Sequence, residues 1–267
     1  MKYDLFVADF DGTLGIAPDY IDPETVETVK EYVKRGGKFV ICTGRMYTSI
    51  RAICLKYGLE GIVISYQGAM VNDVKTGDSI FMGGIDYPLA AEVAGKLLNE
   101  GIQTVVDIDD ILYYEHSSEY TDYYEKAVHI TGRKVDSLID LVMTEKKPVQ
   151  KVGGICDAET AKRLTDKYNE IYKDKLIINN GSPKLIEVIN PACSKGVAVR
   201  FLSEYYGVPF EKIITVGDST NDIELVKGEW HGVAVGDARA ELKAVAKEIT
   251  VPYKEKPVKV LLEKYCL

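Results

Sequence analysis

The chain has 267 residues, 46% of them hydrophobic and 28% charged, with a formal net charge of -8 and a pI near 5.1. This length fits one large domain or a core with an inserted domain, and the composition is that of an ordinary globular protein. An acidic surface repels phosphate-rich partners, so the charge argues against nucleic acid and anionic membranes, and an anionic substrate would need a metal cation and local basic groups.

The start of the chain lacks the layout of a signal peptide, and no apolar stretch approaches membrane-spanning length. Five cysteines are scattered along the sequence without the spacing of a metal site, which indicates reduced thiols. We therefore expect a cytoplasmic protein.

The first part of the chain predicts a β-loop-α-β unit. Residues 3–9 form a β-rich run, and a helix follows in which Asp22 can cap and Pro23 fits the first turn. The helix is predicted to end at Gly36-Gly37, before a strand over 38–42. Two strands joined by a helix favour parallel pairing.

The middle of the chain predicts a different, α+β pattern. Helices are expected over residues 88–99, 118–129 and 158–172, and strands over 102–107, 111–114, 149–156, 176–179 and 184–188. The alternation of strand and helix then returns, with strands over 213–216, 232–235 and 248–251 and helices over 222–227 and 238–247. The sequence therefore predicts an α/β core from residues 1–83 and 188–267, built on a Rossmann-like doubly wound parallel sheet, with an inserted α+β domain over 84–187.

Four short segments fall at predicted strand ends, where open α/β sheets bind ligands. The first contains Asp9 and Asp11, whose mutual repulsion would demand a cation or a shared proton. The alternative is an acidic strand end that leads into an Asp-Gly turn. The second, Thr43-Gly44-Arg45, offers a hydroxyl, a flexible backbone and a guanidinium to a phosphate oxygen, although a strand-ending Thr-Gly is also a common turn.

The third and fourth segments lie in the last part of the chain. Lys195 stands at a predicted helix start, where the helix dipole disfavours a cation unless an anion lies nearby; a solvated lysine is the alternative. The segment 217–222 carries Asp218 and Asp222 one helical turn apart, and hard oxygen ligands suit Mg²⁺. Helix capping by Ser219 or Thr220 is the alternative interpretation of this segment.

Together the four segments supply a nucleophile, a hydroxyl, a cation and metal-binding carboxylates. This combination resembles the haloacid dehalogenase superfamily. The order, with a large insert between Thr43-Gly44-Arg45 and Lys195, resembles its Cof-type phosphatases with a C2B cap. Relatives commonly have Asn where this chain has Tyr66 and Asp237, two departures that concern substrate contacts.

The resemblance implies roles for the residues that match its motifs. Asp9 would attack phosphorus to give an aspartyl phosphate, and Asp11 would protonate the leaving oxygen and then activate water. Thr43 would position the phosphate, and Lys195 would neutralise charge. The resemblance also implies two binding sets: Asp9, Asp11 (through its main-chain carbonyl), Asp218 and Asp222 for Mg²⁺, and Thr13, Gly44, Arg45 and Asn221 for the substrate.

We therefore expect a Mg²⁺-dependent phosphatase that acts on a small phosphorylated metabolite, with the insert as a lid that selects the substrate. Two alternatives remain open. The first is a phosphotransferase or phosphomutase on the same scaffold, and the second is a phospho-acceptor binding module. The sequence names neither the substrate nor the oligomeric state.

Overall fold

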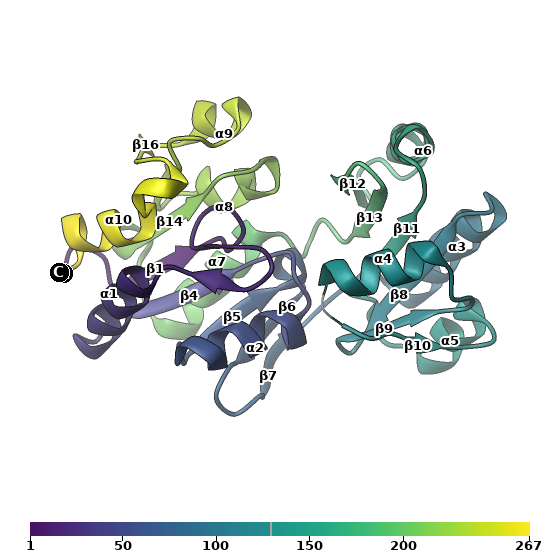
Figure 1. Cartoon of the computed structure of the whole chain (residues 1–267), viewed down its shortest axis with the longest axis horizontal. Helices are drawn as coiled ribbons and strands as arrows, with labels where there is room; N and C mark the ends of the chain where they lie inside the picture. The colour runs from purple at the N-terminus through teal and green to yellow at the C-terminus, as the bar shows by residue number, and fades with distance from the viewer. Residues whose placement is uncertain (129) are drawn as a thin grey trace. The chain divides into compact units, whose positions relative to one another are not determined.

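The computed structural model describes residues 1–128 and 130–267, which form two compact units. The core unit comprises Met1–Phe81 and Ser194–Leu267, and the insert unit comprises Met82–Cys193. Figure 1 shows the purple start and the yellow end of the chain together in the core unit. The chain returns to the core unit later than the predicted residue 188, because β13 (Leu185–Ile189) pairs within the sheet of the insert unit.

The core unit is built on an eight-stranded sheet in the order β16-β15-β14-β1-β4-β5-β6-β7. Its strands from β16 to β5 are parallel, and β6 is antiparallel to β5. The strands are β1 (Leu5–Ala8), β4 (Lys38–Cys42), β5 (Ile62–Ser65), β6 (Met70–Asp73), β7 (Ser79–Met82), β14 (Ile213–Gly217), β15 (His231–Ala234) and β16 (Glu248–Ile249). A small hairpin of β2 (Gly15–Ile16) and β3 (Tyr20–Ile21) follows β1.

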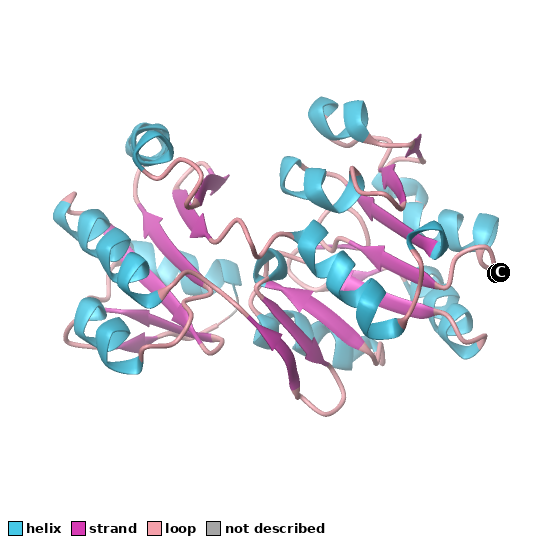
Figure 2. Ribbon diagram, turned by 180° about the vertical axis from the view of Figure 1, so that it is seen from behind, coloured by secondary structure: helices cyan, strands magenta, loops and turns pink. Residues whose placement is uncertain are grey.

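Both faces of this sheet are buried. Phe6 and Ala8 of β1 belong to one hydrophobic cluster, whereas Leu5 and Val7 belong to another. Successive side chains of a strand point to opposite faces, so the two clusters occupy the two sides of the sheet. The helices that cover these faces (Figure 2) are α1 (Pro23–Lys34), α2 (Tyr47–Tyr57), α7 (Lys195–Tyr206), α8 (Ile223–Val226), α9 (Ala240–Val245) and α10 (Pro257–Tyr265). The predicted doubly wound parallel core is confirmed.

The first helix shows how local sequence sets these elements. Asp22 caps α1, and its carboxylate accepts hydrogen bonds from the main-chain N–H groups of Glu24 and Thr25. Pro23 occupies the first turn, where its missing N–H costs no helical hydrogen bond. The predicted cap and start of this helix are confirmed.

The insert unit is an α+β layer, as predicted. Its sheet has the order β10-β9-β8-β11-β13-β12. Val106, Val152 and Val188 on one face of the sheet pack with α3, α5 and α6 in a single core. The elements are α3 (Tyr87–Asn99), β8 (Gln103–Ile108), β9 (Ile111–Tyr114), α4 (Glu119–Val128), β10 (Arg133–Lys134), α5 (Leu138–Glu145), β11 (Lys151–Ile155), α6 (Ala158–Ile171), β12 (Ile177–Ser182) and β13. Of the helix predicted over residues 118–129, His129 lies outside the described residues.

The other face of the insert sheet carries a buried ion cluster. Lys151 Nζ lies 3.5 Å from Asp107 Oδ2 and 3.3 Å from Glu187 Oε1, and 5.4 Å from the centre of the Tyr124 ring of α4. Neither carboxylate oxygen of Asp107 accepts a hydrogen bond within the described residues. Burial raises the pKa of Asp107 to about 6 from its ordinary value of 3.8, and the attraction of Lys151 reverses only part of this shift.

This raised pKa makes the stability of the protein depend on pH. Between pH 3.8 and about 6 the unfolded chain has lost the Asp107 proton while the folded chain retains it, so stability falls as the pH rises through this window. The shift corresponds to a loss on the order of 3 kcal/mol. We expect Asp107→Asn to remove this part of the pH dependence, as measured by urea unfolding at pH 4 to 7. The matched control is Asp166→Asn on the exposed face of α6, which should retain the wild-type slope. Identical slopes for wild type and Asp107→Asn would contradict the assignment.

Within residues 1–128 and 130–267, every helix is too short or too polar to cross a lipid bilayer.

Candidate active site

Three of the predicted site residues lie at the carboxyl ends of three adjacent strands of the core sheet, whereas Lys195 begins α7 and follows no strand of this sheet. Asp9 follows β1, Thr43 follows β4 and Asp218 follows β14, and the sheet order places β1 between the other two. The chain leaves β1 to build one side of the sheet first and the other side later. Such a reversal of strand order opens a crevice for a ligand at the carboxyl ends of the strands.

A buried ion network forms the centre of this site. Lys195 Nζ donates to Asp9 Oδ1 at 2.6 Å and to Asp222 Oδ1 at 2.7 Å. The exposed fractions of Lys195, Asp9 and Asp222 are 1%, 5% and 0%. Lys195 is the first residue of α7, and the two carboxylates supply the negative charge that a cation at a helix start requires. The interpretation of Lys195 as a solvated surface lysine is therefore wrong.

The loop after β14 holds the remaining carboxylates. Asp222 Oδ2 accepts hydrogen bonds from the main-chain N–H groups of Asp218 and Ser219 at 3.0 and 3.1 Å, so both oxygens of Asp222 already have partners. The capping by Ser219 that was an alternative to a metal site is also present, since Ser219 and Asp222 form a capping box. Capping and a polar site therefore coexist in this loop.

Asp218 lies close to the loop that follows β1. The Thr13 hydroxyl donates to Asp218 Oδ1 at 3.5 Å. A Cβ atom added to Gly12, whose φ is +83°, would lie only 2.7 Å from Asp218 Oδ2. Only glycine combines this backbone conformation with this approach, so the Asp-Gly dipeptide serves both the turn and the site.

The charges of the cluster are strongly coupled. Carboxylate oxygens of Asp9, Asp218 and Asp222 lie within 4.8 Å of one another. Burial, and then the charge of Asp222, raise the pKa of Asp9 well above its ordinary value, and the same two causes raise the pKa of Asp218 to about 6. Burial alone would lower the pKa of Lys195, but the charges of Asp222 and Asp9 outweigh it and raise this pKa. Three carboxylates facing one ammonium group make a place suited to a divalent cation.

Asp11 points to a different partner. Its two carboxylate oxygens accept hydrogen bonds from Arg45, Oδ2 from Nε at 2.8 Å and Oδ1 from Nη2 at 2.6 Å. Arg45 Nη1 donates to the main-chain carbonyl of Pro18 at 2.8 Å. Arg45, predicted to bind the substrate, therefore pairs with the predicted acid/base residue.

The loop after β4 also brings in a residue that the sequence analysis did not single out. The Thr43 hydroxyl accepts a hydrogen bond from the main-chain N–H of Arg45 at 3.2 Å. The Gln67 side chain packs so closely against Gly44 that an added Cβ would lie 2.4 Å from its Nε2. Asn221 Nδ2 donates to Gln67 Oε1 at 3.4 Å, so Gln67 links two predicted substrate-binding residues.

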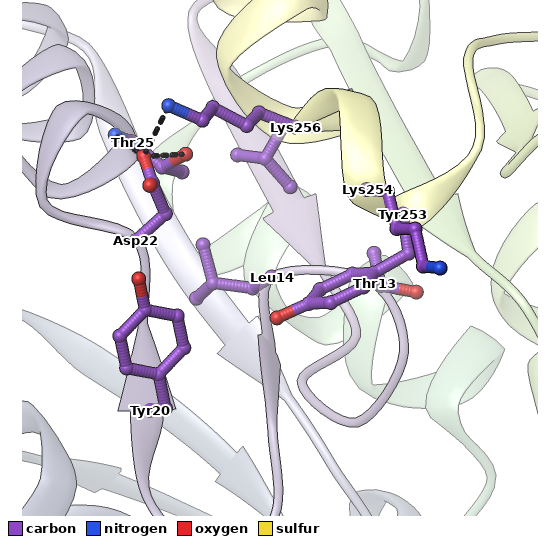
Figure 3. Close-up of a pocket in the computed structure, with 9 residues that line it drawn as sticks. Thr13, Leu14, Tyr20, Asp22, Thr25, Tyr253, Lys254 and Lys256 are labelled. Carbon is purple, nitrogen blue, oxygen red and sulfur yellow. Dashed lines mark hydrogen bonds and ion pairs between the residues drawn. The ribbon is translucent and has the colours of Figure 1, made fainter.

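A separate pocket of about 190 Å³ opens beside the loop that follows β1 (Figure 3). Thr13 and Leu14 line one part of it, and Lys256 pairs with Asp22 at 3.2 Å at one end. The complete lining is Thr13, Leu14, Tyr20, Asp22, Thr25, Tyr253, Lys254, Lys256 and Val258. Thr13 therefore contacts both this pocket and the carboxylate cluster.

The chain belongs to the haloacid dehalogenase-like hydrolase family, whose model matches residues 6–262. A curated relative, the 5-amino-6-(5-phospho-D-ribitylamino)uracil phosphatase YitU of Bacillus subtilis, is 26% identical and covers 98% of this chain and 97% of its own length. Among solved structures, TM0651 from Thermotoga maritima has a TM-score of 0.87 at 27% identity and covers 98% of this chain and 97% of its own.

The structure of the subclass IIB sugar phosphatase BT4131 is similar in fold, with a TM-score of 0.80 at 19% identity over 98% of each chain. The family match and the phosphatase relative confirm the predicted class of enzyme, a phosphatase of this family, and the similar solved structures show the same fold, a core with an inserted α+β cap. Phosphatases of this superfamily generally use a divalent metal ion, and the cluster of Asp9, Asp218 and Asp222 has the chemistry to hold one.

Proposed function

We propose that this enzyme is a Mg²⁺-dependent phosphatase that hydrolyses a small phosphomonoester, a sugar or polyol phosphate, through an aspartyl phosphate on Asp9. The observation that carries the proposal is the position of the Asp9 carboxylate. It lies at the carboxyl end of a central strand, bound to the buried ammonium group of Lys195 at 2.6 Å and next to Asp218 and Asp222.

In the first step, a carboxylate oxygen of Asp9 forms a bond to phosphorus while the bond from phosphorus to the leaving oxygen breaks. Asp11 enters this step with a proton on its carboxyl group and donates it to the leaving oxygen, and the carboxylate that results is the form that Arg45 pairs with. In the second step Asp11 takes a proton from water, the water oxygen attacks phosphorus, and the bond between Asp9 and phosphorus breaks to release phosphate.

Two further side chains stabilise the transferring group. Lys195 balances the negative charge on Asp9 and the phosphoryl oxygens throughout. The Thr43 hydroxyl accepts its hydrogen bond from Arg45, so its own proton remains available to donate to a phosphoryl oxygen.

The residues fit a metal ion with an oxygen-only ligand set. Asp9, Asp218 and the main-chain carbonyl of Asp11 would hold it, because both oxygens of Asp222 are already hydrogen-bonded. When bound, Mg²⁺ neutralises charge that develops on the phosphoryl oxygens. Asp222 then acts as a support, through Lys195 and the loop after β14.

The choice of substrate class rests on the relatives. YitU acts on a phosphorylated ribitylamino compound and BT4131 is a sugar phosphatase, both consistent with a polyol or sugar as the leaving group. We propose that the insert unit selects this group. A cytoplasmic location stays a prediction.

The test is phosphate release from a panel of phosphomonoesters: 4-nitrophenyl phosphate, glycerol 3-phosphate, erythrose 4-phosphate, ribose 5-phosphate and glucose 6-phosphate. Chelator-treated protein is expected to be inactive and to regain turnover with added Mg²⁺. If folded protein shows no Mg²⁺-dependent turnover of any ester in the panel, the proposal is overturned. Transfer of phosphate to an added sugar, without release into water, would instead assign a phosphotransferase.

A further inference from the structure

We infer that Arg45 is a positioning residue, which aims the Asp11 carboxylate at the leaving oxygen and does not bind the transferring phosphate. The inference rests on the proposed function, because it takes Asp11 as the acid of the first step. It assigns Arg45 a different role from the one that its sequence position predicts.

The pairing of the two side chains is bidentate. Nε and Nη2 of Arg45 each donate to a different oxygen of Asp11, at 2.8 and 2.6 Å. A guanidinium fork matched to a carboxylate fixes the orientation of the carboxylate as well as its position. A lysine supplies the same charge but lacks the planar fork.

The third nitrogen of the guanidinium also has an acceptor. Nη1 donates to the Pro18 carbonyl at 2.8 Å, so all three nitrogens of Arg45 have acceptors. Its Cζ lies 4.6 Å from the centre of the Phe10 ring, a distance at which the cation and the ring attract each other. One N–H group remains on each Nη, but a phosphate could take the fork formed by Nε and Nη2 only by displacing Asp11.

The main chain of Arg45 is held in the same way. Its N–H donates to the Thr43 hydroxyl at 3.2 Å, and its carbonyl accepts from the N–H of Tyr66 at 3.0 Å. Hydrogen bonds of its main chain and side chain therefore hold Arg45 between the loop after β4 and the hairpin that follows β1.

Asp11, by contrast, depends on Arg45. The exposed fraction of its side chain is 47%, against 16% for Arg45. In the described part of the chain, Arg45 supplies both hydrogen bonds that the Asp11 carboxylate accepts. Without Arg45 a half-exposed carboxylate on a turn would sample several rotamers, and a misplaced acid loses much of its effect on the rate.

The role predicts a dependence on the leaving group. An alkyl oxygen needs a proton to depart, whereas 4-nitrophenolate departs without one. The parameter kcat/KM covers the steps up to departure of the leaving group, so the later activation of water by Asp11 does not enter it. Loss of a positioned acid should therefore lower kcat/KM for alkyl phosphates selectively.

The experiment compares wild type, Arg45→Ala, Arg45→Lys, Asp11→Asn and the Asp11→Asn/Arg45→Ala double variant. Each is assayed with 4-nitrophenyl phosphate and with the alkyl phosphate of the panel that wild type hydrolyses fastest. We expect Arg45→Ala to lower kcat/KM for the alkyl ester by about 10²-fold, with a loss about tenfold smaller for the aryl ester. Arg45→Lys should regain little of the kcat/KM that Arg45→Ala loses. The double variant should lose no more kcat/KM for the alkyl ester than Asp11→Asn alone.

The matched control is Arg35→Ala, which removes an arginine paired with Glu31 at the exposed end of α1 and should leave both values of kcat/KM unchanged. If Arg45→Ala lowers kcat/KM equally for the two esters, or if Arg45→Lys restores kcat/KM for both, Arg45 binds the phosphate. Either result would overturn this inference but not the proposed function. Arg45→Lys keeps the test valid if Arg45→Ala fails to fold. No turnover of either ester by wild type would overturn the proposed function and this inference with it.

Discussion

Replacement of Asp9 by asparagine is expected to lower kcat by at least about 10⁴-fold, because an amide cannot form the covalent intermediate. Asn has nearly the same volume as Asp and can still present an oxygen to the Lys195 ammonium group, which lies 2.6 Å from Asp9 Oδ1. The loss would therefore come from the chemistry and not from a change in packing.

The same substitution should leave the protein at least as stable as wild type. Burial and the charge of Asp222 raise the pKa of Asp9, so the ionised carboxylate is costly in the folded state at neutral pH. A neutral amide removes this cost, and Lys195 retains Asp222 as its counter-ion.

Turnover of the best panel substrate and the thermal midpoint Tm together test this prediction. Asp78→Asn, on the exposed turn after β6, is the matched control and should match wild type in both measurements. Activity of Asp9→Asn within about tenfold of wild type would remove Asp9 as the nucleophile. Loss of activity together with a large fall in Tm would instead show that the substitution acts by unfolding the protein.

The sequence predicted much of the centre of the site because Asp9 and Asp218 follow strand ends. Parallel strands bring their carboxyl ends to one edge of the sheet, so Asp9 and Asp218, far apart in the chain, were expected to meet. Lys195 was expected to need an anion because it opens a helix, and in the structure Asp9 and Asp222 supply it.

The partners of Asp11 and Gly44 could not be predicted in this way. The pairing of Arg45 with Asp11 depends on how the hairpin of β2 and β3 folds over the loop after β4. Gln67 reaches Gly44 only because Tyr66 and Gln67 both adopt positive φ, which neither residue type favours. The local sequence contains no pattern that predicts such a turn.

Three helices, α2, α5 and α10, were also missing from the sequence prediction, and the local signals of α5 and α2 are weak. The helix α5 has eight residues and buries only Leu138 and Val142, too few positions to establish a helical period. The helix α2 begins without a side-chain cap at Met46, so its start carries no capping signal.

Replacement of Lys195 by methionine is expected to have a large effect on both stability and activity. The substitution conserves an unbranched chain of similar length but leaves the buried Asp9 and Asp222 carboxylates without their shared cation. Removal of one partner from a buried ion network typically costs about 3–5 kcal/mol, because the remaining charges stay desolvated. Loss of the charge that stabilises the phosphoryl oxygens should lower kcat by about 10²–10³-fold.

Urea unfolding and kcat, each measured with chelator and with Mg²⁺, separate these two effects. Added Mg²⁺ should return part of the stability, since a second cation then faces the same carboxylates, but it should not return the activity that needs an ammonium group. The informative control is the Lys195→Met/Asp222→Asn double variant. It removes one of the stranded charges, so it should regain stability relative to Lys195→Met and remain as inactive. If Lys195→Met unfolds at the same urea concentration as wild type in the presence of chelator, the two carboxylates do not need this lysine, and the ion network is not what holds Asp9 in place.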